Sequence, residues 1–136
     1  MVIDPGPYDM DDHRVVLEPA GAAVPRPVTP DFYAALDREF GDFSGHLLVS
    51  RHAFEAAWPT WEMHPAGDEV VYLLSGDVDF VLWEGGRERV VRVSEPGTYV
   101  IVPKATWHTA RPRVPTILLF LTPGEGTRNA EAPEPG

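Results

Sequence analysis

Apolar and polar residues alternate over short distances through residues 45–122, and turn signals cut this region into pieces of strand length. The run over residues 69–74 ends at the dipeptide Ser75-Gly76. The run over residues 78–83 meets Glu84-Gly85-Gly86, a tight hairpin turn. Many short strands at near-regular spacing are typical of a sandwich or a closed barrel. We therefore predict one all-β domain over residues 45–122.

The pattern is different on either side of this domain. Residues 1–28 predict an extended arm, because recurring prolines break any helix there, while residues 15–17 could add a short strand. Residues 29–44 predict one short helix, capped by Thr29 and carrying an apolar stripe at positions i, i+4 and i+8. The stripe suits core packing and consists of Phe32, Leu36 and Phe40. Residues 123–136 carry no large apolar side chain, so we predict a flexible tail.

Composition narrows the classes of function. The chain of 136 residues suits a single domain, and it has no cysteine, which excludes disulfides, thiolate zinc sites and cysteine nucleophiles. A net charge of −10 argues against nucleic acid as a partner. The sequence has no signal-peptide pattern and no apolar run of about 20 residues. We therefore expect no membrane span and a cytoplasmic location.

Two segments combine imidazole and carboxylate side chains. Glu62 and His64 are two residues apart, so on a strand they face the same side. A turn over residues 65–68 can bring Glu69 back toward the same volume, and His108 opens a later strand. Two imidazoles with one or two carboxylates, on facing strands of a small barrel, form a ligand set for one divalent transition metal. The candidate ions are Fe, Mn, Zn and Ni.

These segments resemble the two sequence motifs of the cupin superfamily. The stretch Glu62-x-His64-x4-Glu69-x6-Gly76 is similar to the first motif, and Gly97-x5-Pro103-x-Ala105-x2-His108 is similar to the second. The resemblance covers roughly residues 45–122 and is to compact, single-domain bacterial metal cupins. It implies a double-stranded β-helix, the jelly-roll barrel of cupins, with the metal inside. It also implies that His64, Glu69 and His108 are metal ligands.

The chain departs from the cupin motifs at three places. Glu62 stands where the first histidine is usual, Ala105 replaces a turn glycine, and the asparagine that usually closes the second motif is absent. A negative φ at Ala105 would make that change harmless, since only a positive φ strains alanine there. The missing asparagine removes a supporting contact and says little about the metal.

Glu62 leaves two interpretations open. As a fourth ligand it would help to balance the charge of the ion and favour harder ions such as Mn²⁺ or Fe²⁺. The strand geometry favours this interpretation. Away from the metal, it would leave His64, Glu69 and His108 as the two-histidine, one-carboxylate triad of non-haem iron oxygenases. Glu62 would then be a catalytic general base beside a substrate or water molecule.

Two hypotheses for the function remain, because one fold hosts many chemistries. The first is a metal-dependent enzyme on a small organic molecule, dioxygenase-like in the first place and an isomerase or lyase in the second. The alternative is a non-catalytic cupin that senses or stores a small molecule or a metal. Alternation along the strands predicts an apolar surround for that molecule, formed by Val71, Leu73, Phe80 and Leu82.

Two further expectations concern large side chains. The tryptophans either line the mouth of the barrel or serve as core or interface anchors, and they are Trp58, Trp61, Trp83 and Trp107. The outward-facing side chains Val70, Tyr72 and Leu74 offer an apolar sheet face. Through that face, and in line with the cupin resemblance, we predict a homodimer.

Overall fold

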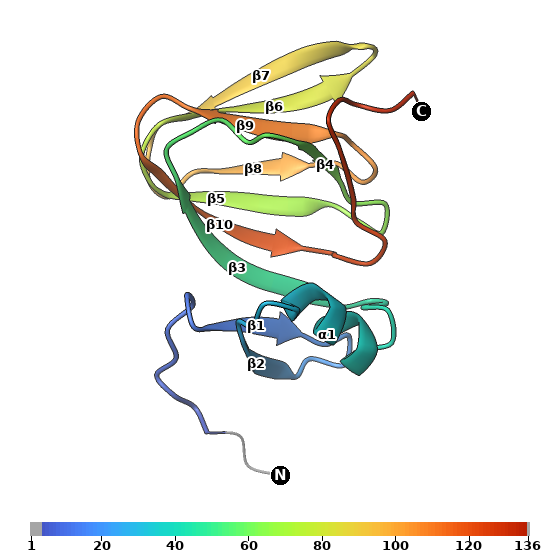
Figure 1. The fold of residues 1–136 in the computed structure, drawn as a ribbon. Helices are drawn as coiled ribbons and strands as arrows, with labels where there is room; N and C mark the ends of the chain where they lie inside the picture. Colours follow the sequence, from blue (N-terminus) through green and yellow to red (C-terminus); the bar gives the residue numbers. More distant parts are fainter. Residues whose placement is uncertain (1–3, 136) are drawn as a thin grey trace.

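The computed structural model describes residues 4–135 as two antiparallel sheets that face each other, with a hairpin and a helix at one end (Figure 1). The strand order is β2-β1-β3-β10-β5-β8 in one sheet and β11-β4-β9-β6-β7 in the other. The elements in chain order are β1 (His13–Leu17), β2 (Ala23–Pro27), α1 (Phe32–Glu39), β3 (Leu47–Phe54), β4 (Trp61–Met63), β5 (Glu69–Ser75), β6 (Val78–Glu84), β7 (Arg87–Val93), β8 (Tyr99–Val102), β9 (His108–Pro112), β10 (Thr116–Thr122) and β11 (Arg128–Ala130).

Strand β5 illustrates how the sheets enclose a core. Glu69, Val71 and Leu73 are buried, while Val70 and Tyr72 between them are only half-buried. This is the predicted alternation, and it sends every second side chain into the space between the sheets. The main core consists of Val71, Leu73, Val78, Phe80, Leu82, Val93, Val100, Val102, Ala110, Leu118 and Phe120. The predicted all-β jelly roll with one short helix is confirmed.

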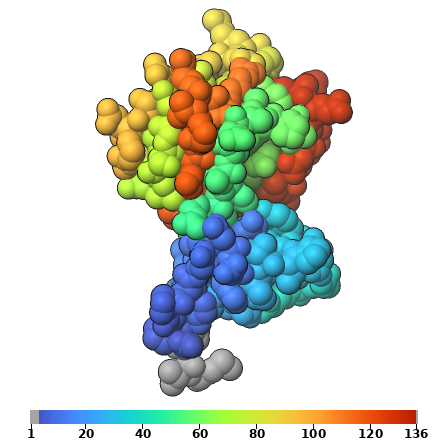
Figure 2. All heavy atoms as spheres, turned by 60° about the vertical axis from the view of Figure 1, so that its left-hand side comes forward, coloured from blue at the N-terminus to red at the C-terminus, as the bar shows by residue number. Residues whose placement is uncertain are grey.

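Residues 4–28 are more regular than the extended arm predicted over residues 1–28, of which residues 1–3 lie outside the described part. The short strand expected over residues 15–17 lies within β1. Strands β1 and β2 pair as a hairpin, and β1 also pairs with β3, so the hairpin extends the first sheet. Pro25 and Pro27 lie in β2, the edge strand, where a missing N–H donor is tolerated. The space-filling view shows this segment as a lobe against the barrel (Figure 2).

Helix α1 is shorter than the predicted span of residues 29–44. Of the predicted stripe, Phe32 and Leu36 are buried and Phe40 is half-buried. The buried pair packs in a second, smaller core with Val16, Phe43 and Leu48. Thr29 does not cap the helix, because its hydroxyl donates to the Asp31 carboxylate at 2.8 Å. Among residues 4–135, no helix has the length and apolar character to cross a membrane.

The C-terminal segment differs from the flexible tail predicted over residues 123–136. Strand β11 pairs with β4, with Arg128 opposite Met63 and Asn129 opposite Glu62. Backbone hydrogen bonds to an exposed strand edge order this segment, rather than burial of large apolar side chains. Composition therefore gave no sign of the strand. The pairing matters for function, because it holds the residues beside β11 against the site.

Candidate metal centre and its cavity

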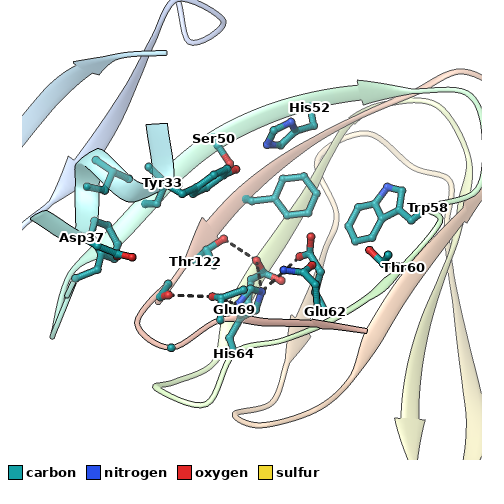
Figure 3. Close-up of a pocket in the computed structure, with 18 of the residues that line it drawn as sticks. Tyr33, Asp37, Ser50, His52, Trp58, Thr60, Glu62, His64, Glu69 and Thr122 are labelled. Atoms are coloured by element: carbon teal, nitrogen blue, oxygen red, sulfur yellow. Dashed lines mark hydrogen bonds and ion pairs between the residues drawn. The ribbon is translucent and has the colours of Figure 1, made fainter. Parts of the chain in front are cut away.

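Four side chains converge between the sheets, as the sequence predicted. Glu62 lies on β4 and His64 just after it, while Glu69 opens β5 and His108 opens β9. Strands β4 and β9 are joined at the pair Glu62 and His108. Glu62, His64 and His108 each offer one ligand atom within 4.8 Å of the others. Figure 3 shows Glu62, His64 and Glu69 directed toward one another.

The distances place Glu69 at the middle of this group. Its Oε2 lies 3.3 Å from Nε2 of His64, and its Oε1 lies 3.2 Å from Nε2 of His108. Oε2 of Glu62 is 3.8 Å from Nε2 of His64 and 3.9 Å from Nε2 of His108. Glu62, His64 and His108 therefore form one group that could hold an ion, and Glu69 contacts both imidazoles of that group.

Three of the candidate ligand atoms are buried and make no hydrogen bond. Glu69 is 2% exposed, His64 4% and His108 0%. Nε2 of each histidine and Oε1 of Glu69 are buried without a hydrogen-bond partner. Buried polar atoms are nearly always paired, and orphaned ones call for an explanation. A divalent cation between these side chains would satisfy all three atoms, so the residues present fit a metal ion.

The second nitrogen of each ring fixes which nitrogen carries the proton. Nδ1 of His108 lies 3.0 Å from the carbonyl oxygen of Thr106, which can only accept, so Nδ1–H donates. Nδ1 of His64 lies 2.8 Å from Oγ1 of Thr127, whose own proton goes to the carbonyl oxygen of Gly124. Thr127 therefore accepts from Nδ1–H of His64. When the rings are neutral, Nε2 of each is left with a free lone pair, as a metal ligand requires.

Glu69 is held as a carboxylate. Burial by itself raises the pKa of Glu69, but hydrogen bonds and charge from the imidazoles of His108 and His64 bring the pKa down to about 2. These effects require a proton on Nε2 and so apply to the metal-free protein. The hydroxyl of Thr122, at the end of β10, donates to its Oε2 at 2.6 Å. The same imidazole pair that suits a metal thus keeps the central carboxylate ionised near neutral pH.

Glu62 has a different environment from Glu69. Its side chain is 36% exposed and borders the open cavity. Burial raises the pKa of Glu62, and the charge of Glu69 adds to this rise, while the imidazoles oppose it. A carboxylate with a raised pKa at the edge of a cavity suits proton transfer, and its distance to both Nε2 atoms also suits ligation. Both predicted roles for Glu62 stay open.

A cavity of about 700 Å³ opens from these residues. Glu62, His64 and Glu69 line it, and together with the fully buried His108 we call them the metal side of the cavity. Tyr33 and Asp37, both from α1, form what we call the helix side (Figure 3). Phe54, Trp58 and Phe120 form the apolar wall of the cavity. The ring centroids of Phe54 and Trp58 are 5.7 Å apart, and those of Trp58 and Phe120 are 5.8 Å apart.

The wall is not made of the residues that the sequence favoured. Val71, Leu73, Phe80 and Leu82 fill the main core and do not line the cavity. Of the tryptophans, only Trp58 lines it. Trp61 and Trp83 pack edge to face with ring centroids 6.1 Å apart, and Trp107 is buried. Sequence analysis missed Thr127, Tyr33 and Asp37, which lie outside the motif region.

Ala105 departs from its expected conformation. Its φ is +61°, in the left-handed region that favours glycine, so the motif position keeps the geometry of the usual residue. The backbone N–H of Ala105 donates to the carbonyl oxygen of His64 at 2.9 Å. This hydrogen bond connects the strained turn before β9 to the backbone of His64, one of the predicted ligands.

Known proteins share the fold without sharing much sequence. No protein-family model and no curated protein sequence matches the chain. A mutant oxalate decarboxylase of Bacillus subtilis matches with a TM-score of 0.52 and 19% identity, over 62% of this chain and 23% of its own. An oxalate oxidase matches with a TM-score of 0.50 and 14% identity, over 60% and 44%. A cupin-2 domain protein of Shewanella frigidimarina has a TM-score of 0.49 and 17% identity, over 57% and 70%.

The likeness to the two oxalate enzymes is one of fold. The matched region spans less than half the length of each of them. A decarboxylase and an oxidase carry the same architecture, so the architecture does not choose the reaction. Function has to be argued from the side chains of the site.

Proposed function

Since the chain has the cupin fold, we propose that it is a metal-dependent enzyme acting on a small organic molecule. One observation carries this proposal. Three buried polar atoms without a hydrogen-bond partner, on His64, Glu69 and His108, lie beside Glu62. A cavity large enough for a small substrate reaches Glu62, His64 and Glu69. A metal site that opens on a cavity is typical of catalysis, whereas structural sites are closed.

His64, Glu69 and His108 would hold the ion, with Glu62 as fourth ligand or as base. A bound divalent metal supplies Lewis-acid chemistry or, with two histidines and one carboxylate, oxygen activation. We therefore place a dioxygenase-like reaction first and an isomerase or lyase reaction second. Fe, Mn, Zn and Ni are the candidate ions.

The residues of the chain have separable tasks in such a reaction. Thr127 and the Thr106 carbonyl orient the two imidazoles. The apolar wall around Trp58 keeps water from one flank of the substrate. Glu62, at the edge of the cavity, would accept a proton on a carboxylate oxygen if it does not ligate the ion.

Metal analysis and oxygen consumption test the proposal. The protein, purified without a metal-affinity step, should contain about one transition metal ion per chain. Loaded with Fe²⁺, it should consume oxygen with at least one member of a panel of catechols, thiols and β-diketones. A protein that takes up no metal, or a metallated protein inert toward oxygen and toward isomerase and lyase substrates, would contradict the proposal.

Variants of Glu62 separate its two roles. Glu62→Ala that keeps its metal but loses activity would establish a base, whereas loss of the metal would establish a ligand. Glu95→Ala is the matched control, because Glu95 is exposed and lies outside the cavity lining. Its metal content and activity should equal those of the unaltered protein.

A non-catalytic binding protein is the second candidate function. The observation in its favour is that Glu62 approaches both Nε2 atoms to within 3.9 Å, close enough to complete a four-ligand set. A metallated protein that binds small molecules but converts none would support this candidate. The homodimer and the cytoplasmic location expected from the sequence stay predictions.

A further inference from the structure

The charges around the cavity are of one sign. The described residues that line it include the carboxylates Asp37, Glu62 and Glu69, and they include no lysine and no arginine. Asp37 lies on the helix side, apart from the other two (Figure 3). A ligand that enters the cavity therefore meets no permanent cation of the protein along its walls.

The lining histidines do not alter this balance. Burial, followed by the positive charge of Arg14, lowers the pKa of His52, so its ring is neutral near pH 7. The Arg14 guanidinium itself donates to the Tyr33 hydroxyl at 3.3 Å and lies 4.8 Å from the centroid of the Phe32 ring. It does not belong to the cavity lining. With a metal bound, Nε2 of His64 would carry a lone pair and no proton, so His64 would add no positive charge.

A divalent ion would not make the cavity attractive to anions. The carboxylates of Glu62 and Glu69 would balance its two positive charges. Asp37 would then leave the cavity with an excess of negative charge. A carboxylate substrate would lose hydration on entry and gain no ion pair with the walls, which is unfavourable in a partly apolar space.

The wall favours a different kind of molecule. Phe54, Trp58 and Phe120 form a continuous aromatic surface, and His52 packs edge to face on Phe120 with ring centroids 5.6 Å apart. Aromatic faces bind flat apolar bodies and attract cations through the ring quadrupole. The charge of the lining residues and the aromatic surface thus both favour a flat apolar or cationic body over an anion.

We infer that the cavity takes an uncharged or cationic small molecule with an apolar, ring-sized body and excludes carboxylates, oxalate among them. This inference rests on the proposed function, since it names the substrate class of the same site. It separates the chain from the oxalate enzymes whose fold it shares.

Matched probes test the inference without turnover. Protocatechuate, methylcatechol and dopamine share one catechol ring and carry an anionic, an uncharged and a cationic substituent. Calorimetric titration of the Zn²⁺-loaded protein should give a Kd for protocatechuate at least about tenfold weaker than for the other two. Oxalate should compete with methylcatechol no better than protocatechuate does. Equal or tighter binding of protocatechuate or oxalate would overturn the inference, as would no binding of any catechol.

Charge reversal on the helix side gives the second arm. Asp37→Lys should reduce the ratio of the Kd for protocatechuate to the Kd for dopamine by several-fold, because it adds a cation to the lining. Glu95→Lys makes the same change of net charge outside the cavity and should leave this ratio unchanged. An equal effect of both variants would overturn the inference. Absence of oxygen consumption with unchanged charge preference would instead contradict only the proposed reaction.

Discussion

The two sides of the cavity are built in different ways. On the metal side, the four side chains come from strands β4, β5 and β9 and the turn after β4, and three of the four are buried with fixed orientation. On the helix side, Tyr33 and Asp37 come from α1 and are exposed. The barrel thus supplies the candidate chemistry, while the N-terminal lobe contributes to the choice of ligand. Changes on one side should leave the other side intact.

Removal of a ligand should have the largest effect. We expect His108→Ala to weaken metal affinity by more than about 100-fold, since even the loss of a partner behind a ligand costs 10–100-fold. His52→Ala removes a histidine of the same cavity that lies outside the metal side, and it should keep full metal content. Metal per chain, measured after dialysis against a weak chelator, compares the two. Equal metal content in both variants would break the distinction between the sides.

Acid should destabilise the metal-free protein through Glu69. Its pKa of about 2 in the folded state lies below its ordinary value, so its stabilising effect is complete only above that ordinary value and is lost as pH falls toward 2. Between about pH 5 and about pH 3 the free energy of unfolding should drop by about 2 kcal/mol more than in Glu69→Gln. Urea unfolding at both pH values measures this. Parallel pH profiles would show that Glu69 has no such role.

The support of the two imidazoles offers a finer comparison. Thr127 holds His64 through its side chain, whereas Thr106 holds His108 through its backbone carbonyl. Thr127→Val should therefore weaken metal affinity by about 10- to 100-fold, and Thr106→Val should have little effect. Competition with a chromogenic chelator gives both affinities. The same loss in both variants would contradict the assignment of Thr127 as a positioning residue.

The smallest expected effect concerns the turn that precedes β9. A left-handed φ costs alanine about 1 kcal/mol relative to glycine. Glycine, however, has more conformational freedom in the unfolded chain, and this offsets about half of that difference. Ala105→Gly should therefore raise the free energy of unfolding by about 0.5 kcal/mol. Ala110→Gly, in the buried part of β9, should lower it. Thermal melts of the two variants test the pair, and destabilisation by both would refute the strain at Ala105.

Much of the barrel and of the metal side could be predicted from the sequence. Strand alternation and two spaced motifs placed Glu62, His64, Glu69 and His108 around one point, because each signal is local and periodic. Thr127 and β11 could not be predicted, since only backbone pairing with β4 brings that polar segment to the site. Tyr33 and Asp37 were missed for a related reason. Their contribution depends on where the helix packs, which no local pattern encodes.

The central claim is that His64, Glu69 and His108 hold one cation, with Glu62 as a fourth ligand or as a base beside it. A crystal structure of the protein soaked with Fe²⁺ or Mn²⁺, with anomalous diffraction recorded at the metal edge, tests it most directly. We predict one strong peak about 2.0–2.3 Å from Nε2 of His64, Nε2 of His108 and an oxygen of Glu69, with Glu62 at or beside it. A peak elsewhere, or ligation through Nδ1, or no peak at full soaking, would contradict the account.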